Sequence, residues 1–189
     1  MNARYTYIAT TLCLCFAGNS MAETYTIDSK HTFPSFEINH IGFSTQRGRF
    51  DRTSGTIMLN SKNEIGSIQV NIDASSIDTG LPELEAKLQG EEFFNTAKFP
   101  SISFISNKVK FKGDSPIATE GTLTLLGVSK TILLAIEHFH CGVHPYTQIY
   151  MCGADATGKI NRSDFGMTAL LPAVGDEVKF TIQVEAFKN

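Results

Sequence analysis

The chain has 189 residues, a formal net charge of −3 and an apolar fraction of 42%. This length suits one domain with a sizeable core, and the acidic balance argues against nucleic acid as the principal partner. The composition therefore favours a single globular domain with some other ligand.

The first 22 residues have the pattern of a cleavable export signal. Arg4 gives a positive start, the apolar stretch 7–16 is too short to span a bilayer, and Ser20-Met21-Ala22 matches a signal peptidase site. We expect cleavage after Ala22, so that residues 23–189 form the exported domain. The sequence has no second apolar segment of spanning length, which argues against a membrane anchor.

The first half of the domain predicts strands. Apolar and polar residues alternate over 24–28, 33–40 and 67–74, and 46–60 reads as a bent strand or a strand pair in which Gly48 and Gly55 predict bulges or bends. Because side chains alternate between the two faces of a strand, each segment has one apolar face. These faces include Phe36 and Ile38 in one strand and Ile68, Val70 and Ile72 in another.

One helix interrupts the strands. Leu81, Leu84 and Leu88 recur at helical spacing, Pro82 suits the first turn, and Gly90 ends the pattern. A single helix with an apolar stripe among strands predicts a plug at one end of a barrel or sandwich.

The second half returns to strands. They are predicted at 101–111, at 154–161, at 178–187 and in a long hairpin over 117–140 that turns at Gly127-Val128-Ser129. The alternation places Ile117, Leu123 and Leu125 on one face of the first arm and Ile132, Leu134 and Ile136 on one face of the second. About eight antiparallel strands form either an up-and-down barrel or a sandwich. We favour the barrel, since no long Greek-key connection is evident.

The cysteines predict a disulfide. Cys13 and Cys15 leave with the signal, whereas Cys141 and Cys152 remain as an even pair in an exported protein. Closing a loop of this size contributes about 3 kcal/mol in the chain-entropy model.

The sequence shows no motif of an enzyme or a cofactor site. It lacks a nucleophile elbow, a phosphate loop, a dinucleotide fingerprint and a zinc-protease motif, so we expect neither catalysis nor a cofactor. His138, His140 and His144 could hold zinc or copper, but the disulfide removes the neighbouring thiolates and we expect no metal. The segment 162–166 predicts a turn with Arg162 in solvent.

The apolar content points to the interior. The chain has 14 phenylalanines and no tryptophan, and many of these rings fall at inward-facing strand positions. A packed core and a lined cavity for a long apolar ligand both fit this pattern. The residues expected to line such a cavity are Phe36, Ile38, Ile68, Val70, Ile72, Phe104, Leu123, Leu125, Ile132 and Leu134.

Several short motifs, taken together and in order, resemble the YceI-like family of periplasmic lipid-binding proteins, also called the polyisoprenoid-binding family. They cover nearly the whole domain: Tyr25-x-Ile27-Asp28-x-x-His31, Phe36 with His40 and Gly42, Gly48-x-Phe50, Gly55-x-Ile57, Ser76-Ile77-Asp78-Thr79, Phe93-Phe94 with Pro100 and Phe104, Gly121-x-Leu123-x-Leu125, Gly127-Val128-x-Lys130, Arg162-x-Asp164-Phe165-Gly166 and Val174-Gly175-Asp176-x-Val178.

The resemblance implies an eight-stranded antiparallel barrel of lipocalin type in the periplasm, often in a homodimer, whose interior takes an isoprenoid or another long amphipathic lipid. It implies no catalytic residues, and the Cys141 and Cys152 pair is not part of the family's general pattern. We therefore expect a carrier of an isoprenoid or quinone-like lipid that makes transient membrane contact. Two alternatives stay open: an enzyme acting on such a lipid, for which His40 is the one hint, and an accessory protein of a membrane redox complex.

Overall fold

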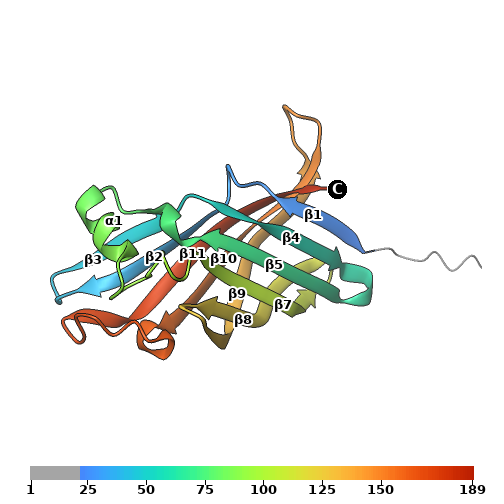
Figure 1. Ribbon diagram of the computed structural model, residues 1–189. Coiled ribbons are helices and arrows are strands. Elements are labelled where there is room, and N and C mark those ends of the chain that lie inside the picture. The colour runs from blue at the N-terminus through green and yellow to red at the C-terminus, as the bar shows by residue number, and fades with distance from the viewer. Residues whose placement is uncertain (1–21) are drawn as a thin grey trace, which may run out of the picture.

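A computed structural model describes residues 22–189 as an antiparallel barrel of eight strands with one short helix at one end (Figure 1). The barrel closes because β1 (Glu23–Ile27) pairs with both β4 (Thr53–Asn60) and β11 (Val174–Lys188). The predicted barrel is confirmed, and the sandwich is excluded. Residues 1–21 of the predicted signal peptide lie outside the described residues.

Between β4 and β11, the strands β5, β7, β8, β9 and β10 are neighbours in the sheet in chain order, whereas β2, β3 and β6 lie beyond β11. Their bounds are β2 (Phe33–His40), β3 (Ser44–Phe50), β5 (Ile65–Asp73), β6 (Ile77–Asp78), β7 (Ser101–Lys112), β8 (Ser115–Leu125), β9 (Val128–Val143) and β10 (Tyr150–Asn161). Short 3-10 turns lie at Ser61–Asn63, Ala74–Ser76 and Arg162–Phe165.

Three strands of the barrel are interrupted and run on past the closed part. In the closed part, β11 pairs with β1 and β1 pairs with β4. In the extension, β11 pairs with β2, β2 pairs with β3, and β3 pairs with β6, which follows β5 in the chain. The extension formed by β2, β3 and β6 lies at the left in Figure 1, at the same end as the helix. The predicted bent strand 46–60 therefore consists of two segments, β3 and β4.

The helix α1 (Pro82–Gln89) starts with a proline in its first turn and ends at Gly90, as predicted. None of its residues is fully buried, but Leu88 packs with Phe94 of the following turn against the cluster of Phe50, Ile72 and Leu125. Edge-to-face contact between Phe50 and Phe94, with centroids 5.4 Å apart, joins this end of the barrel to the segment after the helix.

The register corrects two predicted details of the strands. Gly48 and Gly55, predicted as bulges or bends, do not form bulges, because the registers of β2 with β3 and of β4 with β5 run through them without a shift. Ile117 does not share the inner face of its arm: Lys110 pairs with Ala118 and Phe111 with Pro116, so the chain bulges at Ile117 and its side chain is exposed.

The predicted disulfide joins Cys141 and Cys152, which face each other in the register of β9 and β10. Cys152 is buried with Tyr25 and Ala186 in a second core cluster. Beyond the disulfide, the hairpin between β9 and β10 projects from the barrel (Figure 1). Across residues 22–189, no helix has both the length and the apolar character needed to cross a membrane.

Candidate functional site

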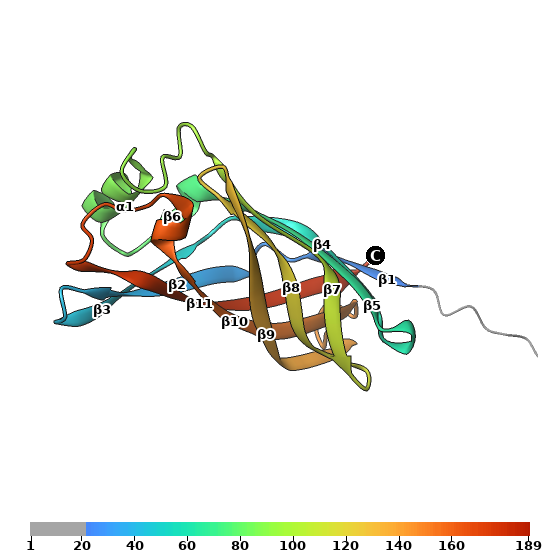
Figure 2. The ribbon, with the colours of Figure 1, turned by 90° about the horizontal axis from the view of Figure 1, so that it is seen from below.

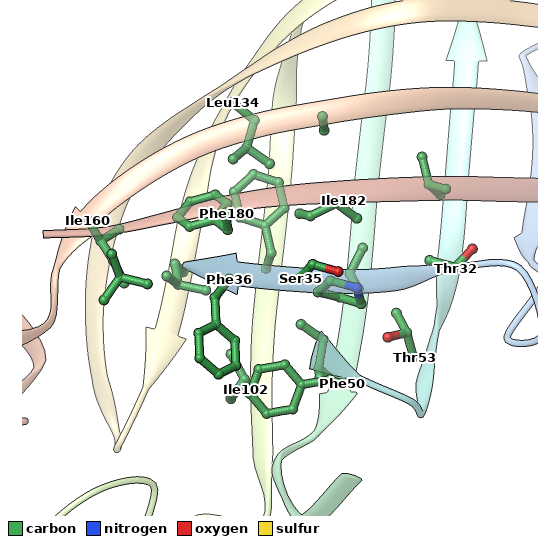
Figure 3. A pocket seen from close by; sticks show the side chains of 18 of the residues that line it. Thr32, Ser35, Phe36, Phe50, Thr53, Ile102, Leu134, Ile160, Phe180 and Ile182 are labelled. Carbon is green, nitrogen blue, oxygen red and sulfur yellow. The ribbon is translucent and has the colours of Figure 1, made fainter. Parts of the chain in front are cut away.

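The barrel encloses an apolar cavity of about 610 Å³. Side chains from strands on all sides point into it, among them Phe36, Phe50, Leu134, Phe180 and Ile182 (Figure 3). The cavity exists because inward-facing positions recur with period two along every strand and the wall is almost entirely aliphatic or aromatic. A cavity of this size lies within the range of about 300–1,000 Å³ that small-molecule sites occupy.

The ten residues expected to line a cavity all lie on its wall: Phe36, Ile38, Ile68, Val70, Ile72, Phe104, Leu123, Leu125, Ile132 and Leu134. Phe50, Ile72, Ile102 and Leu125 also belong to a packed cluster under the helix end, so the interior is part core and part cavity. Their role in holding a ligand stays a prediction.

The sequence-based set omits about half of the barrel. β1, β4, β10 and β11 also contribute wall residues, including Tyr25, Ile57, Leu59, Ala156, Phe180, Ile182 and Val184. The alternation of Val178, Phe180, Ile182 and Val184 was the available signal for β11. Ala156 has a small side chain and carries no comparable signal.

Aromatic rings lie against glycines on neighbouring strands. A Cβ atom at Gly48 would stand 2.6 Å from the Phe36 ring, and one at Gly121 would stand 2.5 Å from the Phe104 ring. Each ring therefore fills the space above a glycine, an arrangement known to stabilise glycine in sheets. Gly48, which the sequence predicted as a bulge or bend, instead makes room for the Phe36 ring on the cavity wall.

One polar group on the wall is left without a partner. Thr53 is 2% exposed, and its hydroxyl has no hydrogen bond among the described residues. The other two buried threonines of the wall are satisfied: Thr32 exchanges hydrogen bonds with the backbone of Glu185, and the Thr119 hydroxyl donates to Ser106. Thr53 is one of the wall residues labelled in Figure 3, so its unpaired hydroxyl is buried within the cavity wall.

Arg162 is buried, which contradicts the prediction that it lies in solvent. It is 3% exposed, and its guanidinium donates hydrogen bonds to the carbonyls of Met167, Val174 and Gly175. Burial lowers the pKa of this guanidinium. Its three contacts hold together the loop that joins the 3-10 turn at Arg162–Phe165 to β11.

The cavity opens at the helix end. Five wall residues are exposed, and all five lie there: Gln46 and Arg47 on β3, Leu81 and Lys87 at α1, and Leu170 in the loop before β11. At the opposite end the wall residues Tyr25, Cys152 and Pro116 are buried. Residues Gln46, Arg47, Leu81, Lys87 and Leu170 are called the mouth below.

Two of the three histidines considered for a metal have separate partners. His138 Nδ1 lies 2.9 Å from Asp155 Oδ2, and His144 Nδ1 accepts hydrogen bonds from the backbone N–H groups of Tyr146 and Thr147. Over residues 22–189, the group of possible metal ligands with converging atoms is a different one, Asp28, His31 and Glu185. The short Asp28 to His31 contact of 2.7 Å accounts for it as a hydrogen-bonded ion pair at a strand end.

The family model for the YceI-like domain matches residues 25–186 of the chain, which is almost the whole barrel. The chain belongs to the YceI-like family. It is 37% identical to the protein YceI of Salmonella arizonae over 175 residues, which cover 91% of each chain. The YceI-like match contains all ten predicted wall residues and the strands of the closed barrel, apart from the outer ends of β1 and β11.

Solved structures of similar fold extend the YceI-like comparison. The YceI protein of Campylobacter jejuni is 28% identical, with a TM-score of 0.65 over 80% of this chain and 90% of that one. BcnA of Burkholderia cenocepacia, at 21% identity, has a TM-score of 0.73 over 85% and 99% of the two chains. A polyisoprenoid binding domain from Saccharophagus degradans, at 17% identity, has a TM-score of 0.66 over 87% and 98%. The last two likenesses concern the fold alone.

Proposed function

We propose that this chain is a periplasmic carrier that holds an isoprenoid or quinone-like lipid in its barrel. The observation that carries the proposal is the enclosed cavity of about 610 Å³ with an apolar wall and one exposed end. The polyisoprenoid binding domain of Saccharophagus degradans, which shares the fold, supports the ligand class. The cleavable signal expected at residues 1–22 and the disulfide support an exported location.

Apolar burial is the main source of binding free energy in such a cavity. Each buried methylene contributes about 0.8 kcal/mol relative to water. A membrane buries the same chain equally well, so the protein competes with the bilayer rather than with water. Selection among lipids must therefore depend on the shape of the cavity and on its few polar groups, of which those at the mouth are the clearest.

The wall favours binding over catalysis. The hydroxyls of Thr32 and Thr119 donate hydrogen bonds to other groups of the protein. His40, on which the enzyme alternative depends, lies at the mouth end of the wall. General acid–base catalysis needs a titrating group within hydrogen-bond reach of the reacting atoms, together with groups that orient it. The lipid-binding role needs only the apolar surface already present.

Native mass spectrometry of protein purified from the exported fraction tests the proposal. We expect a mass increment that corresponds to one lipid and disappears on denaturation, and organic extraction should release an isoprenoid or quinone. Loading the emptied protein with a purified isoprenoid should restore the increment. Protein that carries no lipid and cannot be loaded would contradict the carrier role. Conversion of the lipid during incubation would favour the enzyme.

A further inference from the structure

Two loops beside the mouth expose large apolar side chains. Phe43, in the turn between β2 and β3, is 90% exposed and its neighbour Ile41 is 51% exposed. Leu170, in the loop before β11, is 52% exposed. In Figures 1 and 2 the β2–β3 turn, α1 and the loop before β11 all lie at the left end of the molecule, away from the C-terminus. Ile41, Phe43 and Leu170 are called the apolar rim below.

The rim is held in place rather than left loose. The Ile41 N–H donates to the carbonyl of Ala173 at 2.9 Å, which ties the turn to the loop before β11. Within the turn, Gly42 N–H donates to the side chain of Asn39, and Phe43 N–H donates to the carbonyl of His40. The Val174 N–H in turn donates to the carbonyl of Leu170. Two loops distant in sequence thus form one surface.

Both loops adopt backbone conformations that cost free energy. Ile41 has a φ of 57° and Leu170 has a φ of 62°, in the left-handed region that side chains disfavour and that β-branched residues enter rarely. Such conformations persist where the surrounding structure imposes them, and they concentrate at functional surfaces. Here the hydrogen bond between the loops and those within each loop hold conformations in which both side chains are exposed.

The rim also lacks formal charge. Residues 38–46 and 165–175 contain no Asp, Glu, Lys or Arg. The closest cation along the chain, Arg47, is paired with Glu37 at 3.2 Å. A surface that meets water usually carries charge, whereas an uncharged apolar tip suits insertion among lipid headgroups and acyl chains.

We propose that the apolar rim is a membrane-docking surface, through which the mouth of the cavity faces a lipid bilayer. The proposal rests on the lipid-carrier function proposed above. A long apolar lipid leaves a membrane through water only at a cost of about 0.8 kcal/mol per methylene exposed, so direct contact between mouth and bilayer removes the main barrier to transfer. Leu170 is itself a mouth residue, and Ile41 and Phe43 precede the mouth residues Gln46 and Arg47 on the β2–β3 hairpin, so the route of the lipid lies beside the inserted side chains.

A bilayer fits the rim better than a second copy of the chain does. A second copy seated on the rim would also cover the mouth, which is the exposed part of the cavity wall. The lipid would then have no path out of the barrel. The absence of charge in residues 38–46 and 165–175 further predicts that docking depends little on anionic lipid or on salt.

Vesicle flotation with the full exported protein tests the proposal. The probe is a phosphatidylcholine vesicle, with a second set containing phosphatidylglycerol. We expect the wild type to float with both sets, in low and in high salt. Phe43→Ser combined with Leu170→Ser should reduce the bound fraction about tenfold or more, because losing two apolar side chains that insert into the bilayer weakens partition of the protein into the membrane by at least that factor. Phe43→Leu, which keeps an apolar side chain, should retain most of the binding.

Tyr146→Ser is the matched control, since Tyr146 is 91% exposed on the hairpin between β9 and β10, far from the mouth. It should float like the wild type. Equal losses in Tyr146→Ser and the rim variant, or a wild type that does not bind vesicles, would overturn the docking surface. So would sedimentation showing a wild-type dimer that only the rim variant loses, since the rim would then be an interface between copies. Lipid content, measured separately by native mass spectrometry, distinguishes this failure from a failure of the carrier function.

Discussion

The ring of Phe180 fills the space above Gly158, its directly paired neighbour on β10: a Cβ atom at Gly158 would stand 2.6 Å from Phe180 Cε2. Phe36 over Gly48 and Phe104 over Gly121 repeat the arrangement on other strands. Because the wall has a gap at each glycine, each ring can lie in that gap instead of extending toward the middle of the cavity. The cavity volume therefore depends on these glycines as well as on the large apolar residues.

Gly158→Ala should shrink the cavity. The new methyl group meets both the Phe180 ring and Leu134 Cδ2, at 2.6 and 2.9 Å, so the ring must move toward the lumen. We expect less lipid per protein in native mass spectra and a loss of about 1–3 kcal/mol in the free energy of unfolding, as overpacking usually costs.

The control for this variant is Gly153→Ala on the same strand. There the nearest atom to a new Cβ would be the Val184 carbonyl oxygen at 3.5 Å, an ordinary contact. This variant should keep its lipid and its stability. If Gly158→Ala and Gly153→Ala retain equal amounts of lipid, the rings over glycines do not set the cavity volume.

Leu84→Asp should impair closure of the helix end. Leu84 lies on the cavity wall and is half-buried, so an aspartate there places a charge against apolar surface. We expect the variant to lose bound lipid during gel filtration while the wild type retains it, with a melting temperature lowered by a few degrees.

Glu83→Lys is the suitable control on the exposed side of the same turn. Glu85 would be a poor control, because its carboxylate accepts hydrogen bonds from the backbone N–H and the hydroxyl of Thr79. Identical lipid retention in Leu84→Asp and Glu83→Lys would show that the apolar stripe of α1 does not seal the cavity.

Thr53→Val should affect the empty protein and the lipid-loaded protein differently. Valine has the shape of threonine, and in the empty barrel it removes a buried hydroxyl that lacks a partner. We expect the empty variant to unfold at the same temperature as the wild type or slightly higher. A lipid whose polar group reaches Thr53 should bind more weakly, by about 0.5–1.5 kcal/mol for one lost hydrogen bond.

Competition between lipids makes this prediction specific. A quinone or prenol whose terminal oxygen reaches Thr53 should lose affinity for Thr53→Val, whereas a plain hydrocarbon chain should bind both proteins equally. A hydrocarbon that discriminates between them would mean that the substitution acts through packing.

The Asp28 and His31 pair predicts a pH dependence of stability. The hydrogen bond to Asp28 raises the pKa of His31. The contribution of His31 to the free energy of unfolding is therefore complete below the ordinary imidazole pKa of 6.5 and disappears as pH rises through the raised pKa. Burial alone would raise the pKa of Asp28, but hydrogen bonds from His31 and from the Lys30 N–H outweigh it and lower the pKa. The Asp28 contribution is therefore complete above its ordinary value of 3.8 and disappears as pH falls through the lowered pKa.

The stabilisation by the pair should thus be largest between those two ordinary values. The difference in melting temperature between the wild type and His31→Gln should peak there and narrow on both sides. NMR titration gives the direct measurement: His31 should titrate above 6.5, and Asp28→Asn should return it toward that value. A wild-type His31 that titrates at or below 6.5 would contradict the pairing.

Local patterns in the sequence predicted much of the fold. The inward positions of Ile68, Val70 and Ile72, the helix with its proline start and glycine end, and the cysteine pair all follow from spacing along the chain. These features depend on the period of a strand or helix and on the chemistry of neighbouring residues, so they do not require knowledge of which strands pair.

Tertiary structure decided the rest, because it depends on contacts between distant segments. The bulge at Ile117 reflects its register with β7, and the burial of Arg162 reflects three carbonyls at Met167, Val174 and Gly175 that only the folded loop brings together. The mouth and the apolar rim likewise arise where β3, α1 and the loop before β11 meet. The sequence by itself determined that the inner faces are apolar. Whether those faces pack solid or enclose space depended on which ring meets which glycine across the sheet, since only pairing between strands sets that geometry.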